Sequence, residues 1–343
     1  MKRKLSIEAN PGFALECYHN FRLSVVLSVK SNIYWLHSHF INLMVTQVDS
    51  DFPTLRFEDH LDVYSNVIEE ELHVDTGDII PFIKCQLNKG HYVLLYLDWA
   101  LIPDSHFYNK KPMIHECLVY GYNDETNKLS ILAFEVSNTT FGSIEVDYHT
   151  CTHAFHQVLK RENYAQKWFA FYGFPLSVIK GLQNHDTRLN RQKIFFALEK
   201  GMACSSHVKS GYSLGYGVPH ILSSFFKERI NENTIDPFYF PYWNIINQKL
   251  LLHNNIALTR LQLIEHEDGH STMLQKILSI FQEIRSMLKS NKLNSINFQK
   301  KPETALCIEI SNGLRKIGEK ERRANTMLLE YFVSQHIGKY IPQ

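Results

Sequence analysis

Cysteine is scarce in this chain of 343 residues, with only six, at positions 17, 85, 117, 151, 204 and 307. None of them forms a CxxC pair, and a scaffold stabilised by disulfides would be both shorter and richer in cysteine. We therefore expect reduced thiols, which is the normal state of cysteine in the cytoplasm.

The sequence also lacks an excess of charge of one sign, long hydrophobic runs and an export signal. Its 36 basic and 35 acidic residues leave a net charge of +1, which gives no support for a nucleic-acid-binding protein. The longest apolar runs, such as YVLLYL, are much shorter than a membrane span. No apolar segment follows the basic start MKRKLSIEANPGF, so no secretory signal is predicted. These absences favour a soluble cytoplasmic protein with neither a nucleic-acid nor a membrane partner.

The length and the hydrophobic content of 44% indicate a folded chain of two domains. Short segments rich in β-branched and aromatic residues predict strands at 91–102, 115–122, 128–135 and 142–149. The cluster NDETN (123–127) predicts a hairpin loop, and the apolar spacing over 18–36 predicts a helix. Beyond residue 150 the spacing is mostly helical. We therefore expect an α+β domain over residues 1–150 and a helical domain over 151–343.

Two short motifs suggest chemistry in the second half of the chain. GYSLG (211–215) matches the G-x-S-x-G elbow of serine hydrolases, but no apolar strand precedes it, and a glycine-rich connection into the next helix is the simpler interpretation. HEDGH (266–270) has the H-E-x-x-H spacing that binds zinc, with Glu267 as base. Asp268 and Gly269 suit an exposed turn better, and no third ligand is evident. We therefore predict no metal site there and no bound cofactor.

A cysteine and a histidine form the third candidate. Cys17 lies at the start of the predicted helix, where N–H groups and the helix dipole favour a thiolate, and His115 opens a predicted strand. Together they are the minimum for covalent acyl chemistry. The alternative is that Cys17 is a small core residue and His115 a buried structural one.

A catalytic histidine works best when a third residue orients it. If residue 122 pairs with residue 128 across the predicted hairpin, Glu135 lies opposite His115. A slip of one residue would place Val136 there instead.

The segments LECYHNFRLSVVLS and LLYLDWALIPDSHFYNKKPMIHECLVYGYND resemble the N-terminal domain family of butirosin biosynthesis protein H over roughly residues 10–136. The resembling features are Cys17 at a helix start, the run from Asp98 to Pro103, and the strand that begins at His115. The resemblance implies a papain-like fold with a helix packed on an antiparallel sheet. It also implies that Cys17, as nucleophile, takes an acyl group from the phosphopantetheine arm of an acyl carrier protein and passes it to an amine, with His115 as general base, in specialised-metabolite biosynthesis such as antibiotic production.

The chain departs from that family at the third catalytic position, where an aspartate is usual. Ala133 stands near the expected place and Glu135 two residues beyond it, so Glu135 either substitutes or the third member is absent. Asn10 is the one side-chain amide available upstream as an oxyanion donor. Asp98 is either a pocket residue or a strand-end acid that holds the next loop, and the structural role is favoured.

Three functions therefore remain open: acyl transfer, hydrolysis by the same pair as a peptidase, amidase or thioesterase, and binding without catalysis. Basic clusters that could steer an acidic carrier protein occur at Lys110–Lys111 and on a C-terminal helical segment. The second cluster comprises Arg315, Lys316, Lys320, Arg322 and Arg323. A solvated surface is the simpler interpretation of that second cluster.

Overall fold

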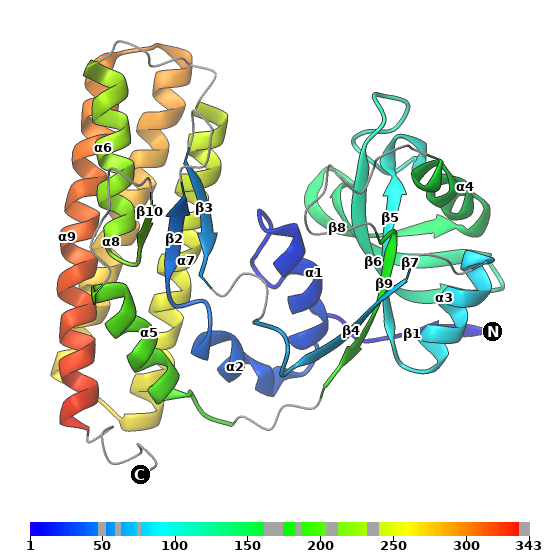
Figure 1. Ribbon diagram of the computed structural model, residues 1–343, viewed down its shortest axis with the longest axis horizontal. Helices are drawn as coiled ribbons and strands as arrows, with labels where there is room; N and C mark the ends of the chain where they lie inside the picture. Colours follow the sequence, from blue (N-terminus) through cyan, green and yellow to red (C-terminus); the bar gives the residue numbers. More distant parts are fainter. Residues whose placement is uncertain are drawn as a thin grey trace. The chain divides into compact units, whose positions relative to one another are not determined.

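The chain is an α+β protein, as predicted, and it divides into two compact units. The computed structural model describes residues 1–46, 53–58, 63–73, 77–160, 174–182, 187–203, 212–231 and 240–335. The first unit comprises Met1–Asn32 and Tyr64–His185, and the second comprises Ile33–Val63 and Asp186–Gln343. Figure 1 shows that a sheet dominates the first unit and that long helices dominate the second.

The described part of the first unit forms a seven-stranded antiparallel sheet in the order β4-β9-β5-β6-β7-β8, with β1 paired to β6. Its strands are β1 (Lys2–Lys4), β4 (Ile68–His73), β5 (Tyr92–Asp98), β6 (Ile114–Asn123), β7 (Lys128–Val136), β8 (Thr139–Asp147) and β9 (Leu176–Gly181). The four strands predicted between residues 91 and 149 are thus present. β4 and β9 were not predicted.

The β6–β7 hairpin follows the predicted register in three of its six pairs, and the predicted pair of residues 122 and 128 is not formed. Cys117 pairs with Ala133 and Val119 with Ile131, as expected, but a bulge between Val119 and Gly121 then shifts the pairing by one residue. The backbone of β1 passes so close to Gly121 that a Cβ there would lie 3.0 Å from the carbonyl oxygen of Arg3. The bulge therefore lies where β1 joins β6, and it shortens the predicted five-residue loop to residues 124–127.

The helix predicted over 18–36 is interrupted. α1 (Cys17–Val26) ends where the Ser28 hydroxyl and N–H both bind the carbonyl of Val25, and a 3-10 turn, η1 (Lys30–Asn32), follows. α2 (Ile33–Ser38) then begins the second unit. In the first unit, α3 (Ile79–Asn88) and α4 (Tyr148–Leu159) contribute apolar side chains to the main core on the sheet.

The second unit contains a small antiparallel sheet and the predicted long helices. The sheet has the order β10-β2-β3, with β2 (Leu43–Thr46), β3 (Thr54–Phe57) and β10 (Tyr212–Leu214). The helices, besides α2, are α5 (Arg191–Ala203), α6 (Gly217–Asn231), α7 (Phe240–Asp268), α8 (Thr272–Lys300) and α9 (Thr304–Ser334). α8 packs on both α7 and α9, and α6 packs on α9 (Figure 1).

The observed division differs from a single boundary at residue 150. Residues 33–63 belong to the helical unit because β2 pairs with β10, which lies far along the chain. Residues 151–185 belong to the strand-rich unit because β9 inserts between β4 and β5. Sequence periodicity describes local structure, so it cannot reveal these pairings between distant segments.

Candidate active site

Cys17 is the first residue of α1, as the sequence predicts, and its side chain is half-buried. The chain approaches it through Gly12, whose φ of +89° lies in the left-handed region that glycine tolerates. The N–H of Glu16 then donates to the carbonyl of Phe13 at 2.8 Å and turns the chain into the helix. Cys17 therefore occupies the turn of α1 in which backbone N–H groups point out of the helix.

A buried arginine fixes α1 to the sheet. Arg22 donates two hydrogen bonds to the carboxylate of Glu70 on β4, at 2.9 and 2.7 Å, and its guanidinium lies 3.8 Å from the ring centre of Tyr18. The hydroxyl of Ser177 on β9 also donates to Glu70 at 2.6 Å. Because Arg22 lies little more than one helical turn beyond Cys17, this fork restricts where the start of the helix can move.

The structure brings Cys17 within electrostatic range of Tyr96 on β5. Burial raises the pKa of Tyr96, and the negative charges of Glu116, Glu70 and Cys17 act in the same direction, while Arg22 opposes them. Tyr96 is therefore a neutral phenol that lies within electrostatic range of the Cys17 sulfur. Neither Tyr96 nor Glu116 was predicted as a site residue, although a glutamate in the apolar strand segment HECLVYGY is a signal of a buried polar group.

Tyr96 and Glu116 are cross-strand partners in the β5–β6 pair, and the next pair along is Leu97 with His115. Cys17 thus lies within electrostatic range of Tyr96, the residue that precedes the cross-strand partner of His115 on β5. Burial raises the pKa of Glu116 to about 7, although the positive charge of Arg22 opposes this rise. Near neutral pH this carboxyl group is therefore close to half-protonated.

His115 is buried, with 8% of its surface exposed, and its ring orientation is set by two contacts. Its Nδ1 lies 3.0 Å from the carbonyl oxygen of Glu116, and its ring stacks on Phe134 at 5.2 Å between centroids. A carbonyl can only accept, so Nδ1 carries the proton, and a neutral ring has its proton-accepting lone pair on Nε2. Burial lowers the pKa of His115, which favours this neutral, basic form at physiological pH.

Glu135 does not take the place predicted for it beside His115 in the strand register. The β6–β7 register ends at the pair Cys117–Ala133, and Glu135 has a φ of +51°. Its carbonyl accepts from the N–H of His106 at 2.9 Å, and the following Val136 bridges to Ser105. The chain bends at Glu135 to meet the loop after β5. Phe134 is the β7 side chain that stacks on His115, and the Glu116 carbonyl holds Nδ1 where a carboxylate was expected.

Asp98 is a buried strand-end acid, which is the role that the sequence favoured. Its Oδ1 accepts from the N–H of Ala100 at 3.2 Å and from the N–H of Met113 at 3.1 Å. The first bond begins the 3-10 turn η2 (Trp99–Leu101), and the second ties the end of the loop to β5. Asp98 thus fixes both ends of the loop that leads into His115.

Asn10 lies on an exposed stretch of chain, where its backbone N–H donates to Glu8 Oε1 at 3.1 Å. A side chain in water is a poor oxyanion donor, because preorganised, water-excluded donors give most of the stabilisation. Tyr96, which is buried and within electrostatic range of Cys17, fits that role better.

A second histidine, His19, lies near Cys17 in sequence. It is fully buried, and its Nδ1 lies 2.9 Å from the hydroxyl of Tyr64. Residues two apart on a helix point in different directions, so His19 and Cys17 do not share a helix face.

Neither motif of the second unit has the geometry of the kind of site that its residue spacing resembles. Tyr212–Leu214 is strand β10 and not a glycine-rich connection, and Ser213 is fully buried within it and not exposed on a turn. Gly211 lies outside the described residues. In HEDGH, α7 ends at Asp268, and Gly269, with φ +84°, breaks the helix before His270. Glu267 and Asp268 bind Arg191 at 2.8 and 2.5 Å, so this helix end is an ionic contact and not a free helix face.

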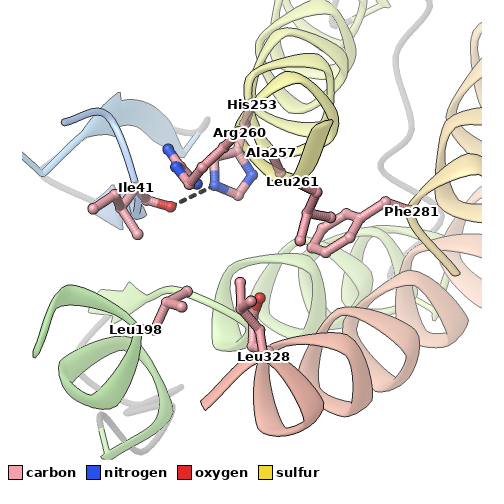
Figure 2. A pocket seen from close by; sticks show the side chains of 9 residues that line it. Ile41, Leu198, His253, Ala257, Arg260, Leu261, Phe281 and Leu328 are labelled. Atoms are coloured by element: carbon pink, nitrogen blue, oxygen red, sulfur yellow. Dashed lines mark hydrogen bonds between the residues drawn. The ribbon is translucent and has the colours of Figure 1, made fainter. Parts of the chain in front are cut away.

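The second unit also contains a small cavity with a buried histidine and a buried arginine on its wall (Figure 2). Its lining residues are Ile41, Leu198, His253, Ala257, Arg260, Leu261, Phe281, Asn325 and Leu328. The Nε2 of His253 donates to the carbonyl of Ile41 at 2.7 Å. His253 and Arg260 are both joined to backbone carbonyls, which favours a structural role.

Two further features are absent from the described residues. No group of three or more histidine, cysteine, aspartate or glutamate side chains is arranged to hold a metal ion within those residues. Within the same part of the chain, no helix combines the length and the hydropathy that crossing a membrane requires.

In comparisons with known proteins, the sequence matches no family model and no curated protein. The resemblance to the butirosin biosynthesis protein H family stays a prediction, as do the papain-like fold and the activity that it implies.

Proposed function

We propose that this protein is a cysteine-dependent acyltransferase, in which Cys17 takes an acyl group from the thioester of an acyl carrier protein and transfers it to an amine. One observation carries the proposal. The half-buried thiol at the start of α1 lies within electrostatic range of Tyr96 on β5, and the adjoining strand β6 carries a neutral histidine whose Nδ1 proton is bound to a carbonyl.

Each residue of this arrangement has a role in the proposed reaction. His115 Nε2 accepts the Cys17 proton, and the thiolate attacks the thioester carbonyl, which expels the phosphopantetheine thiol. That thiol takes the proton from His115 as it leaves. The amine then attacks the Cys17 thioester and gives its proton to His115, which returns it to the Cys17 sulfur as the amide is released. The N–H of Cys17 and the hydroxyl of Tyr96 are the proposed oxyanion donors.

The carrier protein is the proposed partner because the acyl donor is a phosphopantetheine thioester. Lys110 and Lys111 are exposed on the loop between β5 and β6, so they can attract an acidic partner to the unit that carries Cys17. The basic cluster on α9 supports this role less well. Glu319 pairs with Arg315 at 2.6 Å, and Glu283 pairs with Lys320 at 2.5 Å, so part of its charge is neutralised.

Hydrolysis is the second candidate, because water can replace the amine after the same acyl-enzyme has formed. A protein that has lost catalysis is the third, and it is favoured only by the missing carboxylate beside His115. The Glu116 carbonyl argues against this third reading, since it already fixes the tautomer that a base needs.

The proposal is tested by intact-protein mass after incubation with acyl-pantetheine or an acyl-loaded carrier protein. We expect an added acyl mass on the wild type and none on Cys17→Ala. Cys85→Ala, which removes an exposed thiol on α3, should keep the adduct. His115→Gln should form it at least about a hundredfold more slowly, as expected for loss of a general base. An adduct that persists in Cys17→Ala would refute the assignment. Rapid release without an added amine would identify a hydrolase.

A further inference from the structure

The helix α4 exposes three histidines on one side and buries its apolar residues on the other. His149, His153 and His156 are exposed, whereas Cys151, Ala154, Phe155 and Val158 are buried. Within the described part of the chain, no hydrogen bond or ion pair joins these three imidazoles to another group.

His149 and His153 are one helical turn apart and already lie as a pair. Their ring centroids are 6.5 Å apart, and the ring planes are within 2° of parallel. Histidines at positions i and i+4 of a helix share a face, which is why this spacing binds zinc in helical metal sites. Two Zn–N bonds of about 2.0–2.1 Å require the rings to close by a modest side-chain rotation, and exposed side chains are free to make it.

The local charge also favours a cation. Asp147, the N-cap of α4, lies close enough to His149 for an electrostatic interaction. Its two oxygens accept from the N–H and the hydroxyl of Thr150, at 2.7 and 2.6 Å, so it contributes charge and not a coordinating atom.

His266 and His270 have the same sequence spacing as His149 and His153, but they do not lie on one continuous helix. His266 is in the last turn of α7, but Gly269 ends the helix and His270 lies beyond it, 3.3 Å from Glu265. The sequence alone pointed to this second pair, because the glutamate in HEDGH completes a known motif. The structure instead assigns the productive geometry to HTCTH (149–153), where the helix is continuous.

We propose that His149 and His153 form a surface site for a divalent transition-metal ion, with Zn²⁺ as the physiological candidate. The two imidazoles occupy two coordination positions, and water or a ligand from another molecule occupies the rest. Imidazole ligands suit Zn²⁺, Ni²⁺ and Cu²⁺, whereas Mg²⁺ and Ca²⁺ prefer oxygen. This site lies outside the proposed acyl-transfer chemistry and does not depend on it.

The test is equilibrium dialysis of the full-length protein against Zn²⁺, followed by elemental analysis. We expect the wild type to hold one Zn²⁺ more than the double variant His149→Gln/His153→Gln. Each single substitution should lower the affinity of that site for Zn²⁺ by at least about tenfold, since even residues that only orient a metal ligand change metal affinity by this much. Thiols that bind Zn²⁺ are common to all variants and cancel in the difference. Mg²⁺ should not compete.

The double variant His266→Gln/His270→Gln is the matched control, and it should retain the additional ion. His156→Gln should retain it as well, which distinguishes the 149–153 pair from the 153–156 pair. Equal Zn²⁺ content in the wild type and His149→Gln/His153→Gln would overturn the proposal, and so would a loss confined to either control. Because the substituted residues are exposed, far-UV circular dichroism should be unchanged throughout.

Discussion

Among the described residues, each unit buries one arginine. Each unit also buries a glutamate, Glu116 or Glu321, whose pKa is raised by burial to about 7, but the two units use these groups differently. In the strand-rich unit, Arg22 is bound by the carboxylate of Glu70, and Glu116 lies nearby. The arginine has a charged partner, so it joins α1 to β4 and sets the helix that carries Cys17.

In the helical unit the arginine has backbone partners. Arg260 on α7 donates to the carbonyls of His37, His39 and Phe40, at 2.7, 3.1 and 3.2 Å. Phe40 has a φ of +52°, which is unfavourable for a bulky side chain, and the guanidinium holds this bend in place. The comparison indicates that the contacts of Arg22 position the helix that begins at Cys17, whereas the contacts of Arg260 hold the bend of the chain after α2.

The largest effect is expected in the helical unit. Arg260→Met removes three charge-assisted hydrogen bonds and leaves buried carbonyls without donors, so it should lower the free energy of unfolding by about 4 kcal/mol. Urea denaturation followed by circular dichroism measures this loss. Arg260→Lys should recover only part of it, because an ammonium group lacks the fork geometry. A loss below about 1 kcal/mol would show that water replaces the guanidinium at the carbonyls.

The second-largest loss of stability is expected in the strand-rich unit, where the buried arginine has a charged partner. Glu70→Gln leaves Arg22 buried without its carboxylate, and we expect a loss of about 3 kcal/mol, at the low end for buried pairs because Glu70 is partly exposed. Iodoacetamide labelling of Cys17 should also slow, because α1 loses its anchor. Glu69→Gln is the matched control on the same strand, since its pair with Lys180 is exposed on both sides. A similar loss of stability in both variants would contradict the anchoring role.

The third effect depends on pH and concerns Glu321 on α9. Burial raises its pKa to about 7 from 4.5, so the folded state holds a proton that the unfolded state releases. The contribution of Glu321 to the free energy of unfolding is fully present below pH 4.5 and is lost as the pH rises towards and past 7. Glu321→Gln removes this fall, so the variant should gain about 2.5 kcal/mol relative to the wild type between pH 5 and pH 8.

The neighbouring His253 makes the comparison between variant and wild type necessary. Burial lowers the pKa of His253 to about 4, and the positive charge of Arg260 acts in the same direction. The contribution of His253 to the free energy of unfolding is therefore lost as the pH falls below about 6.5. Its Nδ1 lies 3.9 Å from Glu321 Oε1, but the imidazole is neutral at pH 7, so this contact is not an ion pair there. A difference between Glu321→Gln and the wild type that does not change with pH would refute the assigned pKa.

The smallest effect is expected at the surface of α9. Arg315 and Glu319 form an exposed pair one helical turn apart, so Arg315→Ala should cost about 0.3–0.5 kcal/mol and less at high salt. Thermal unfolding at low and high ionic strength measures this. A cost comparable with that of Glu70→Gln would remove the distinction between buried and surface charges on which the comparison depends.

Local patterns in the sequence predicted much of the first unit. The four strands from residue 91 to 149 follow from their composition, and the position of Cys17 at the start of α1 follows from apolar spacing. These features depend on residues that are close in sequence.

Features that depend on distant residues were not predictable in this way. The bulge near Gly121 lies where β1 pairs with β6, and the bend at Glu135 meets the loop after β5. Either irregularity changes which residues pair, so the register of the hairpin cannot be predicted from its two strands alone. Tyr96 was not predicted because a tyrosine in a strand is usually a core residue. Its electrostatic interaction with Cys17 depends on the position of α1, which the sequence alone does not give.

The most direct test of the account is the rate at which iodoacetamide labels Cys17 and Cys85 at pH 6, measured by peptide mapping. Cys85 is an exposed thiol on α3, whereas Cys117, Cys151 and Cys307 are buried, with pKa values that burial raises. We predict that the half-buried Cys17 reacts first, and that His115→Gln removes its advantage, because the thiolate forms by transfer of its proton to the histidine. Equal or faster labelling of Cys85 in the wild type would contradict the claim that Cys17 is a nucleophile.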